Sequence, residues 1–75
     1  MNLSGAEIGK TYEIKKIELS EDKKSRLLDL GLTKGTKIEV VNFFKNGPMI
    51  VSVRGRRLAM GREYILGIVV LEMEL

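Results

Sequence analysis

The side chains that most often carry covalent chemistry are scarce in this sequence of 75 residues. It has no cysteine and no histidine, so it lacks the thiolate and imidazole that commonly act as nucleophile, general base or soft-metal ligand. Its carboxylates are scattered, and no base is evident for its serines, which are Ser4, Ser20, Ser25 and Ser52. The glycine-containing turns match neither the Walker phosphate loop nor the dinucleotide fingerprint. The sequence therefore predicts no catalytic residue, no cofactor and no enzyme activity.

Two charged clusters are the remaining candidates for binding chemistry. Glu18, Glu21 and Asp22 could offer oxygen ligands to a hard cation, but acidic residues here are also typical of a helix start, and we predict no metal ligand. The other cluster consists of the arginines around one turn, Arg54, Arg56, Arg57 and Arg62. They could hold the phosphates of a nucleic acid, although the chain has only two tyrosines and two phenylalanines for base stacking. A solvated turn or a protein-facing patch is therefore the favoured interpretation of this cluster.

Length and composition place these clusters in one small folded domain, residues 1–75. Hydrophobic residues make up 44% of the chain, which is typical of a globule rather than a disordered segment. The 13 basic and 10 acidic residues give a net charge of +3, and both signs are spread along the chain. No apolar run approaches the roughly 20 residues needed to span a bilayer, and no signal peptide is evident. We expect a cytoplasmic protein without membrane insertion.

The stretch from Arg26 to Val40 changes its hydrophobic periodicity from that of a helix to that of a strand. Ser20 is expected to cap a helix of at most three turns, which Gly31 ends. Its inward-facing residues are predicted to be Leu27, Leu28 and Leu30. Gly35 then supplies a positive φ in a tight turn, and alternation with a period of two begins at Thr36.

Five segments alternate polar and apolar residues as strands do. They are Thr11–Leu19, the segment with Ile38 and Val40 and with Phe44 as a further candidate, Met49–Val53, Arg57–Met60 and Ile68–Leu75. A phase slip near Lys15 and Lys16 predicts a β-bulge, and Asn46–Gly47 predicts a type I′ hairpin turn. Short helical turns are expected over residues 3–8, capped by Ser4, and over residues 62–66.

Short strands joined by tight turns, with one helix after the first strand, predict a small closed or nearly closed β-barrel. Closure would remove the free strand edges. The strand after Gly35 and the last strand carry apolar residues on both faces, more than one barrel interior can hold. Coverage by the helix and the N-terminal segment is one explanation. An exposed patch for a protein partner or for self-association is the other.

Beyond these physical arguments, the chain resembles the FeoA family over almost its whole length. The residues that carry the resemblance are Leu3, Arg26–Leu32, Gly35–Thr36, Ile38–Val40, Gly47–Pro48, Ile50–Gly55, Leu58–Met60 and Ile68–Val70. The combination of the leucine-glycine helix end, the second glycine and the strand after the hairpin is more specific than any one part. The resemblance implies a mainly β fold with one or two short helices, a small barrel of the SH3-like kind.

The resemblance also implies a function, that of a cytosolic accessory protein of ferrous iron transport that acts with the membrane GTPase FeoB and has no reaction of its own. We expect docking at the helix and its exit, through Arg26, Leu27, Asp29, Leu30, Gly31, Leu32 and Gly35. Leu27 and Leu30 would give apolar contacts, and Arg26 and Asp29 charged ones, although a purely structural role is equally open for either leucine. The alternative is a small basic barrel that binds nucleic acid. A homo-oligomer is possible in either case.

Overall fold

A computed structural model describes residues 1–74 of the chain. Two short helices and five strands follow a single 3₁₀ turn, η1. Their bounds are η1 Leu3–Gly5, β1 Thr11–Ile17, α1 Glu21–Asp29, β2 Lys37–Phe43, β3 Met49–Val53, β4 Arg56–Met60, α2 Arg62–Ile65 and β5 Ile68–Glu72. The predicted mainly β fold is confirmed. Leu75, the predicted end of the last strand, lies outside the described residues.

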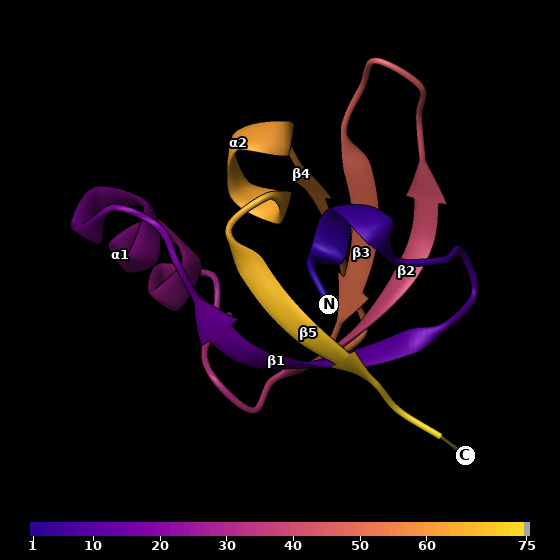
Figure 1. Cartoon of the computed structure of the whole chain (residues 1–75), viewed down its shortest axis with the longest axis horizontal. Coiled ribbons are helices and arrows are strands. Elements are labelled where there is room, and N and C mark those ends of the chain that lie inside the picture. The colour runs from indigo at the N-terminus through magenta and orange to yellow at the C-terminus, as the bar shows by residue number, and fades with distance from the viewer. Residues whose placement is uncertain (75) are drawn as a thin grey trace.

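The strands form one antiparallel sheet in the order β4-β3-β2-β1-β5. The sheet curls around a core to which every strand and both helices contribute, and α1 lies to one side of it (Figure 1). The predicted β-bulge in β1 is confirmed by a register shift between Ile14 and Lys16. The bulge lets Tyr12 and Ile14 be fully buried while Ile17, beyond the shift, still packs against the same core.

Helix α1 begins and ends where the sequence predicts. The hydroxyl of Ser20 accepts a hydrogen bond from the backbone N–H of Lys23 at 3.3 Å, which satisfies one of the free donors of the first turn. Gly31 has a φ of 84°, and the N–H of Leu32 donates to the carbonyl of Leu27 at 2.8 Å. This is a Schellman motif, and its usual apolar contact joins two buried leucines, Leu27 and Leu32.

The structure corrects the predicted orientation of two leucines in this helix. Leu27 is 1% exposed and faces the core, but Leu28 is 63% exposed and Leu30, just after the helix, 43%. The reason is the width of the contact. A helix of at most three turns contacts the core along one narrow face, which buries Leu27. The chain reversal after the helix then buries Leu32. Leu28 and Leu30 are left on the two sides of that face, where they are exposed.

Two predicted local features are wrong. The type I′ turn lies at Arg54–Gly55, where both φ values are positive (52° and 81°), and not at Asn46–Gly47. A two-residue turn at Asn46–Gly47 would need an N–H at Pro48 to close it, which proline lacks. The loop therefore extends over residues 44–48, with only Asn46 at positive φ and Phe44 outside the strand. The N-terminal turn is capped by the side chain of Asn2 rather than by Ser4.

The N-terminal residues of the chain pair with β5. The ammonium of Met1 donates to the carbonyl of Val70 at 2.9 Å, and the N–H of Val70 donates to the carbonyl of Met1 at 2.7 Å. β5 ends at Glu72, earlier than predicted, because its partner β1 begins only at Thr11. The N-terminal residues thus cover the outer edge of β5.

Gly67 offers a direct test of how tightly the turn between α2 and β5 packs against the segment after β1. A Cβ at this position would overlap the side chain of Leu19 and lie 2.7 Å from the carbonyl oxygen of Glu18. We expect Gly67→Ala to lower the free energy of unfolding by about 1–3 kcal/mol, the usual cost of overpacking, in urea denaturation. Gly5→Ala is the matched control, because its Cβ would meet nothing nearer than 3.6 Å. Equal stability of the two variants would contradict the packing described here.

Candidate functional site

An apolar groove of about 180 Å³ separates α1 from β4 and α2. We call it the α1 groove, and it is lined by Arg26, Leu27, Leu30, Ala59, Met60 and Tyr64. Buried Leu27 and Met60 form its floor, whereas Leu30 and Ala59 are exposed and Tyr64 is half-buried. An open groove with an apolar floor and a single guanidinium at its rim suits a protruding apolar side chain of another protein.

The spacing of residues along α1 explains which side chains reach the groove. With 3.6 residues per turn, Arg26 and Leu30 lie on one flank of the buried Leu27, and Lys24 and Leu28 lie on the other. The lining of the groove confirms this division, since it includes Arg26 and Leu30 but neither Lys24 nor Leu28.

The exit of α1 is held in place by several polar contacts. The hydroxyl of Thr36, which is buried, accepts from the N–H of Thr33 at 3.1 Å and donates to the carbonyl of Gly31 at 3.4 Å. The N–H of Gly35 donates to the carbonyl of Ile14 at 2.7 Å. Gly31 also lies under Arg54, whose guanidinium would be 3.3 Å from any Cβ there. These contacts fix the direction of the helix and therefore the width of the α1 groove.

A second, more polar hollow of about 370 Å³ continues from the groove along α1. It shares Arg26 and Tyr64 with the groove and is otherwise lined by Ser20, Asp22 and Lys23. A ligand that enters the groove with an apolar group can therefore extend toward two cations and one carboxylate. This arrangement favours an acidic or polar flank on the ligand.

The structure brings together only part of the predicted docking set. Arg26 and Leu30 line the groove and are accessible, and Leu27 lies beneath them as its floor. Leu32 is buried in the core and Gly31 is half-buried, so both position the helix rather than offer a surface. Asp29 and Gly35 are exposed but line neither hollow. Their part in binding stays a prediction.

The opposite wall of the groove was not predicted as part of the site. Ala59, Met60 and Tyr64 come from β4 and α2, about thirty residues further along the chain. The only sequence signal was Tyr64 itself, an aromatic residue in a short polar turn that could have been assigned a surface role.

Two of the four arginines that the nucleic-acid alternative needs have protein neighbours of their own. Arg54 reaches back to Gly31 at the end of α1. Arg62 lies over the ring of Phe43, 5.5 Å from its centroid, in a cation–π contact. Each has a protein neighbour of its own, so these two guanidiniums do not form one row for a phosphate backbone.

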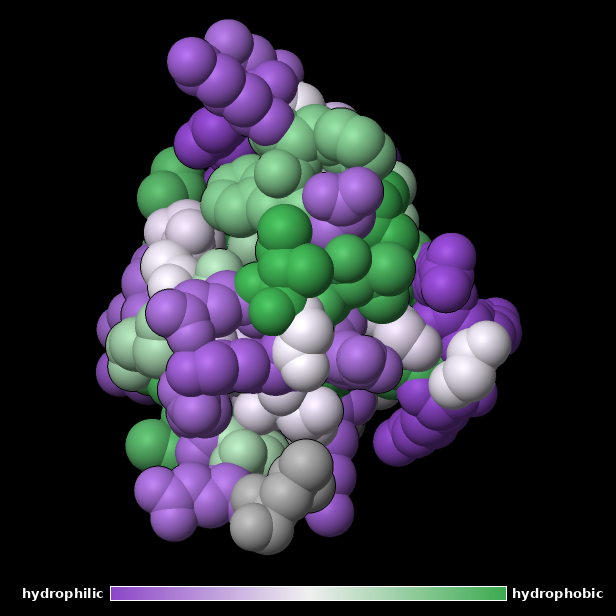
Figure 2. All heavy atoms as spheres, turned by 90° about the vertical axis from the view of Figure 1, so that its right-hand side faces the viewer, coloured by the Kyte–Doolittle hydropathy of each residue, from purple (hydrophilic) through white to green (hydrophobic). Residues whose placement is uncertain are grey.

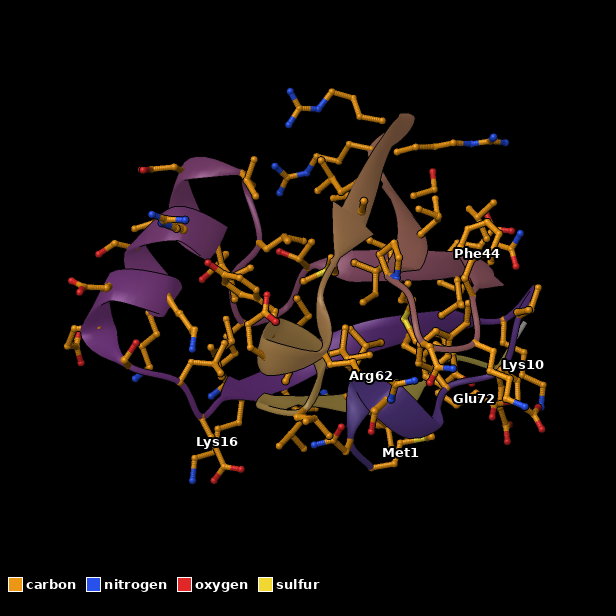
Figure 3. All side chains as sticks on the ribbon, turned by 90° about the horizontal axis from the view of Figure 1, so that it is seen from above. Met1, Lys10, Lys16, Phe44, Arg62 and Glu72 are labelled. Atoms are coloured by element: carbon orange, nitrogen blue, oxygen red, sulfur yellow. The ribbon has the colours of Figure 1, made fainter. Side chains whose placement is uncertain are left out.

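A cluster of lysines that the sequence analysis did not single out lies on the other flank of α1. Lys15, Lys16, Lys24 and Lys34 line an open hollow of about 480 Å³. Figure 3 shows Lys16 on the side of the molecule that carries α1. Lys15 pairs with Glu13 at 3.0 Å and Lys16 with Glu18 at 3.2 Å, which offsets part of the positive charge.

The face away from α1 carries a separate apolar area, visible as a green region in Figure 2. Phe44 lies on this side of the molecule (Figure 3) and is half exposed. Nearby, Lys10 contacts Glu7 and lies 3.4 Å from the carboxylate of Glu72. The hydrogen bond and charge of Glu7, followed by those of Glu72, raise the pKa of Lys10 above its ordinary value. These contacts attach the loop before β1 to β5.

Within residues 1–74, no group of three or more acidic side chains is arranged to hold a metal ion. Glu18 instead forms the ion pair with Lys16. No helix in the same range is long and apolar enough to cross a bilayer.

The sheet order, the bulged first strand and the accessible groove define a small SH3-like barrel with a surface suited to binding another macromolecule. The family model of the FeoA domain matches residues 1–70. The chain belongs to the FeoA family, and the resemblance seen in the sequence is confirmed.

Individual relatives agree with this assignment. The chain is 33% identical over 72 residues to the "Putative Fe(2+) transport protein A" of Methanocaldococcus jannaschii, covering 96% of this chain and 87% of the relative. The solution structure of the FeoA protein from Chlorobium tepidum superposes with a TM-score of 0.90 at 33% identity, over 99% of this chain and 71% of that one. A crystal structure described as an iron uptake regulatory protein (FeoA) gives a TM-score of 0.86 at 29% identity, over 97% and 96%.

Proposed function

We propose that this chain is a cytosolic accessory protein of ferrous iron transport, which binds the cytosolic portion of an FeoB-like membrane transporter. The observation that carries the proposal is the α1 groove in a chain of the FeoA family, with Leu30 accessible above an apolar floor. The names of the relatives, an Fe(2+) transport protein and an iron uptake regulatory protein, support the transport context.

The groove has the composition expected of a protein-binding site. An apolar centre formed by Leu27, Leu30 and Met60 is bordered by an arginine and a tyrosine, two residue types that are enriched at the energetic centre of interfaces. The scarcity of nucleophiles and bases supports a binding role and argues against an enzyme. The protein would regulate its partner through contact alone.

The proposal is tested by isothermal titration calorimetry between this protein and the purified cytosolic portion of the FeoB-like transporter of the same organism. We expect saturable binding that weakens moderately as salt is raised, because Arg26 contributes a charged contact at the rim. The full transporter in detergent is measured in parallel, in case the binding surface includes its membrane domain. Absence of binding in both titrations would refute the proposal.

A further inference from the structure

The outer edge of β4 is the free edge of the sheet. β4 and β5 are the terminal strands, but Met1 and Asn2 pair with β5 at Val69 and Val70. In the part of the chain that the structure describes, β4 pairs only with β3. Of the closed and nearly closed barrels that the sequence allows, the structure has the nearly closed form, and its open strand lies beside the groove that α1 and α2 border.

The hairpin geometry defines which backbone groups of β4 point outward. The two-residue turn at Arg54–Gly55 makes Val53 and Arg56 a hydrogen-bonded pair. Hydrogen-bonded and non-hydrogen-bonded pairs alternate along an antiparallel ladder, so Leu58 and Met60 also bond to β3. Arg57 and Ala59 then direct their N–H and C=O groups away from the sheet, and both residues are exposed.

This free edge and the α1 groove are one continuous surface. Ala59, whose backbone points outward, also lines the groove opposite Leu30 of the helix exit. A segment that paired with Ala59 would place every second side chain on the groove side. One of these side chains would enter the space above Leu27 and Met60.

The charges around the edge select among possible occupants. Arg56 and Arg57 lie on β4, Arg26 on the groove rim and Lys23 in the adjoining hollow, against a single carboxylate from Asp22. Two copies of this chain paired through β4 would bring their arginines face to face, which is unfavourable. An acidic segment of a different protein meets no such repulsion.

We infer that the partner adds an extended segment as a sixth strand on the outer edge of β4, with a large apolar side chain in the α1 groove and an acidic residue near the arginines. Main-chain hydrogen bonds to Arg57 and Ala59 would hold the segment, and the groove would select its sequence. The inference rests on the proposed function, because the partner is the cytosolic portion of the FeoB-like transporter.

The test is amide hydrogen exchange measured by NMR on the labelled protein, alone and with that cytosolic portion. In the free protein, we expect the amides of Arg57 and Ala59 to exchange rapidly and those of Leu58 and Met60 to be protected by their hydrogen bonds to β3. On binding, we expect the Arg57 and Ala59 amides to slow by at least about tenfold, because they become hydrogen-bonded. Binding without this protection would overturn strand addition while leaving the proposed docking intact. No binding at all would overturn both.

A proline variant provides an independent measurement. Ala59→Pro removes the outward N–H, at the kind of edge position where proline is tolerated, and we expect binding to weaken by about tenfold. Lys45→Pro is the control, since residue 45 is exposed in the loop after β2 and its N–H has no backbone partner among residues 1–74. Full affinity in Ala59→Pro would contradict strand addition. If Ala59→Pro does not fold, the exchange measurement on the unmodified protein decides.

Discussion

Leu30→Glu is expected to weaken binding of the transporter's cytosolic portion by about 100-fold, which corresponds to a loss of about 2.7 kcal/mol. Leu30 is 43% exposed and lines the α1 groove, so its side chain is available to a partner without disturbing the core. A carboxylate there would have to be desolvated against apolar atoms on binding, a cost well above the loss of the leucine contact alone. Calorimetric titration of the variant against the parent measures the effect.

Leu28→Glu is the matched control for this prediction. Leu28 belongs to the same helix and is more exposed, at 63%, but it lies on the flank with the lysines and does not line the groove. The same change of charge and size should leave affinity within about threefold and stability within about 0.5 kcal/mol. Equal losses in the two variants would show that net charge, rather than the α1 groove, determines binding. Unchanged affinity in Leu30→Glu would move the binding site elsewhere.

Local features of this fold were predictable because each depends on a few neighbouring residues. Ser20 caps α1 because its side chain accepts from a free N–H of the first turn, and Gly31 ends the helix because the backbone there takes a positive φ. The bulge in β1 follows in the same way from the phase slip at Lys15 and Lys16. Of the two local failures, the hairpin at Asn46–Gly47 came from applying a two-residue preference without considering that Pro48 cannot close the turn.

The site was only half predictable, because it depends on how distant elements meet. Periodicity identifies leucines at helical spacing, but the direction in which the helix rests on the sheet decides that Leu27 is buried and Leu30 accessible. The facing wall, with Ala59 and Tyr64, is placed by the β3–β4 hairpin and by α2. The free edge of β4 depends on a contact of still longer range in the sequence. The N-terminal residues pair with β5 and leave the edge of β4 uncovered.

Leu27→Ala is expected to lower the free energy of unfolding by about 2–5 kcal/mol. Leu27 is 1% exposed, and its carbonyl and side chain both take part in the Schellman motif that ends α1. A domain of this length has a total stability of roughly 4–11 kcal/mol, so the variant would lose a large share of it. Urea denaturation measures the loss, and Leu28→Ala, the same change at an exposed neighbour, should cost less than about 0.5 kcal/mol.

The same variant separates the two roles that the sequence left open for Leu27. If Leu27 serves only the core, its loss reduces binding only in proportion to the fraction of molecules that remain folded, because the apparent Kd rises as that fraction falls. If Leu27 also contacts the partner from the floor of the groove, affinity falls further than the folded fraction accounts for. Leu30→Glu should show the reverse, lost affinity at unchanged stability. Two results together would assign the partner contact to Leu30 and the support of the groove to Leu27. In Leu27→Ala, the loss of affinity would match the loss of folded protein, and in Leu30→Glu affinity would fall while stability stayed unchanged.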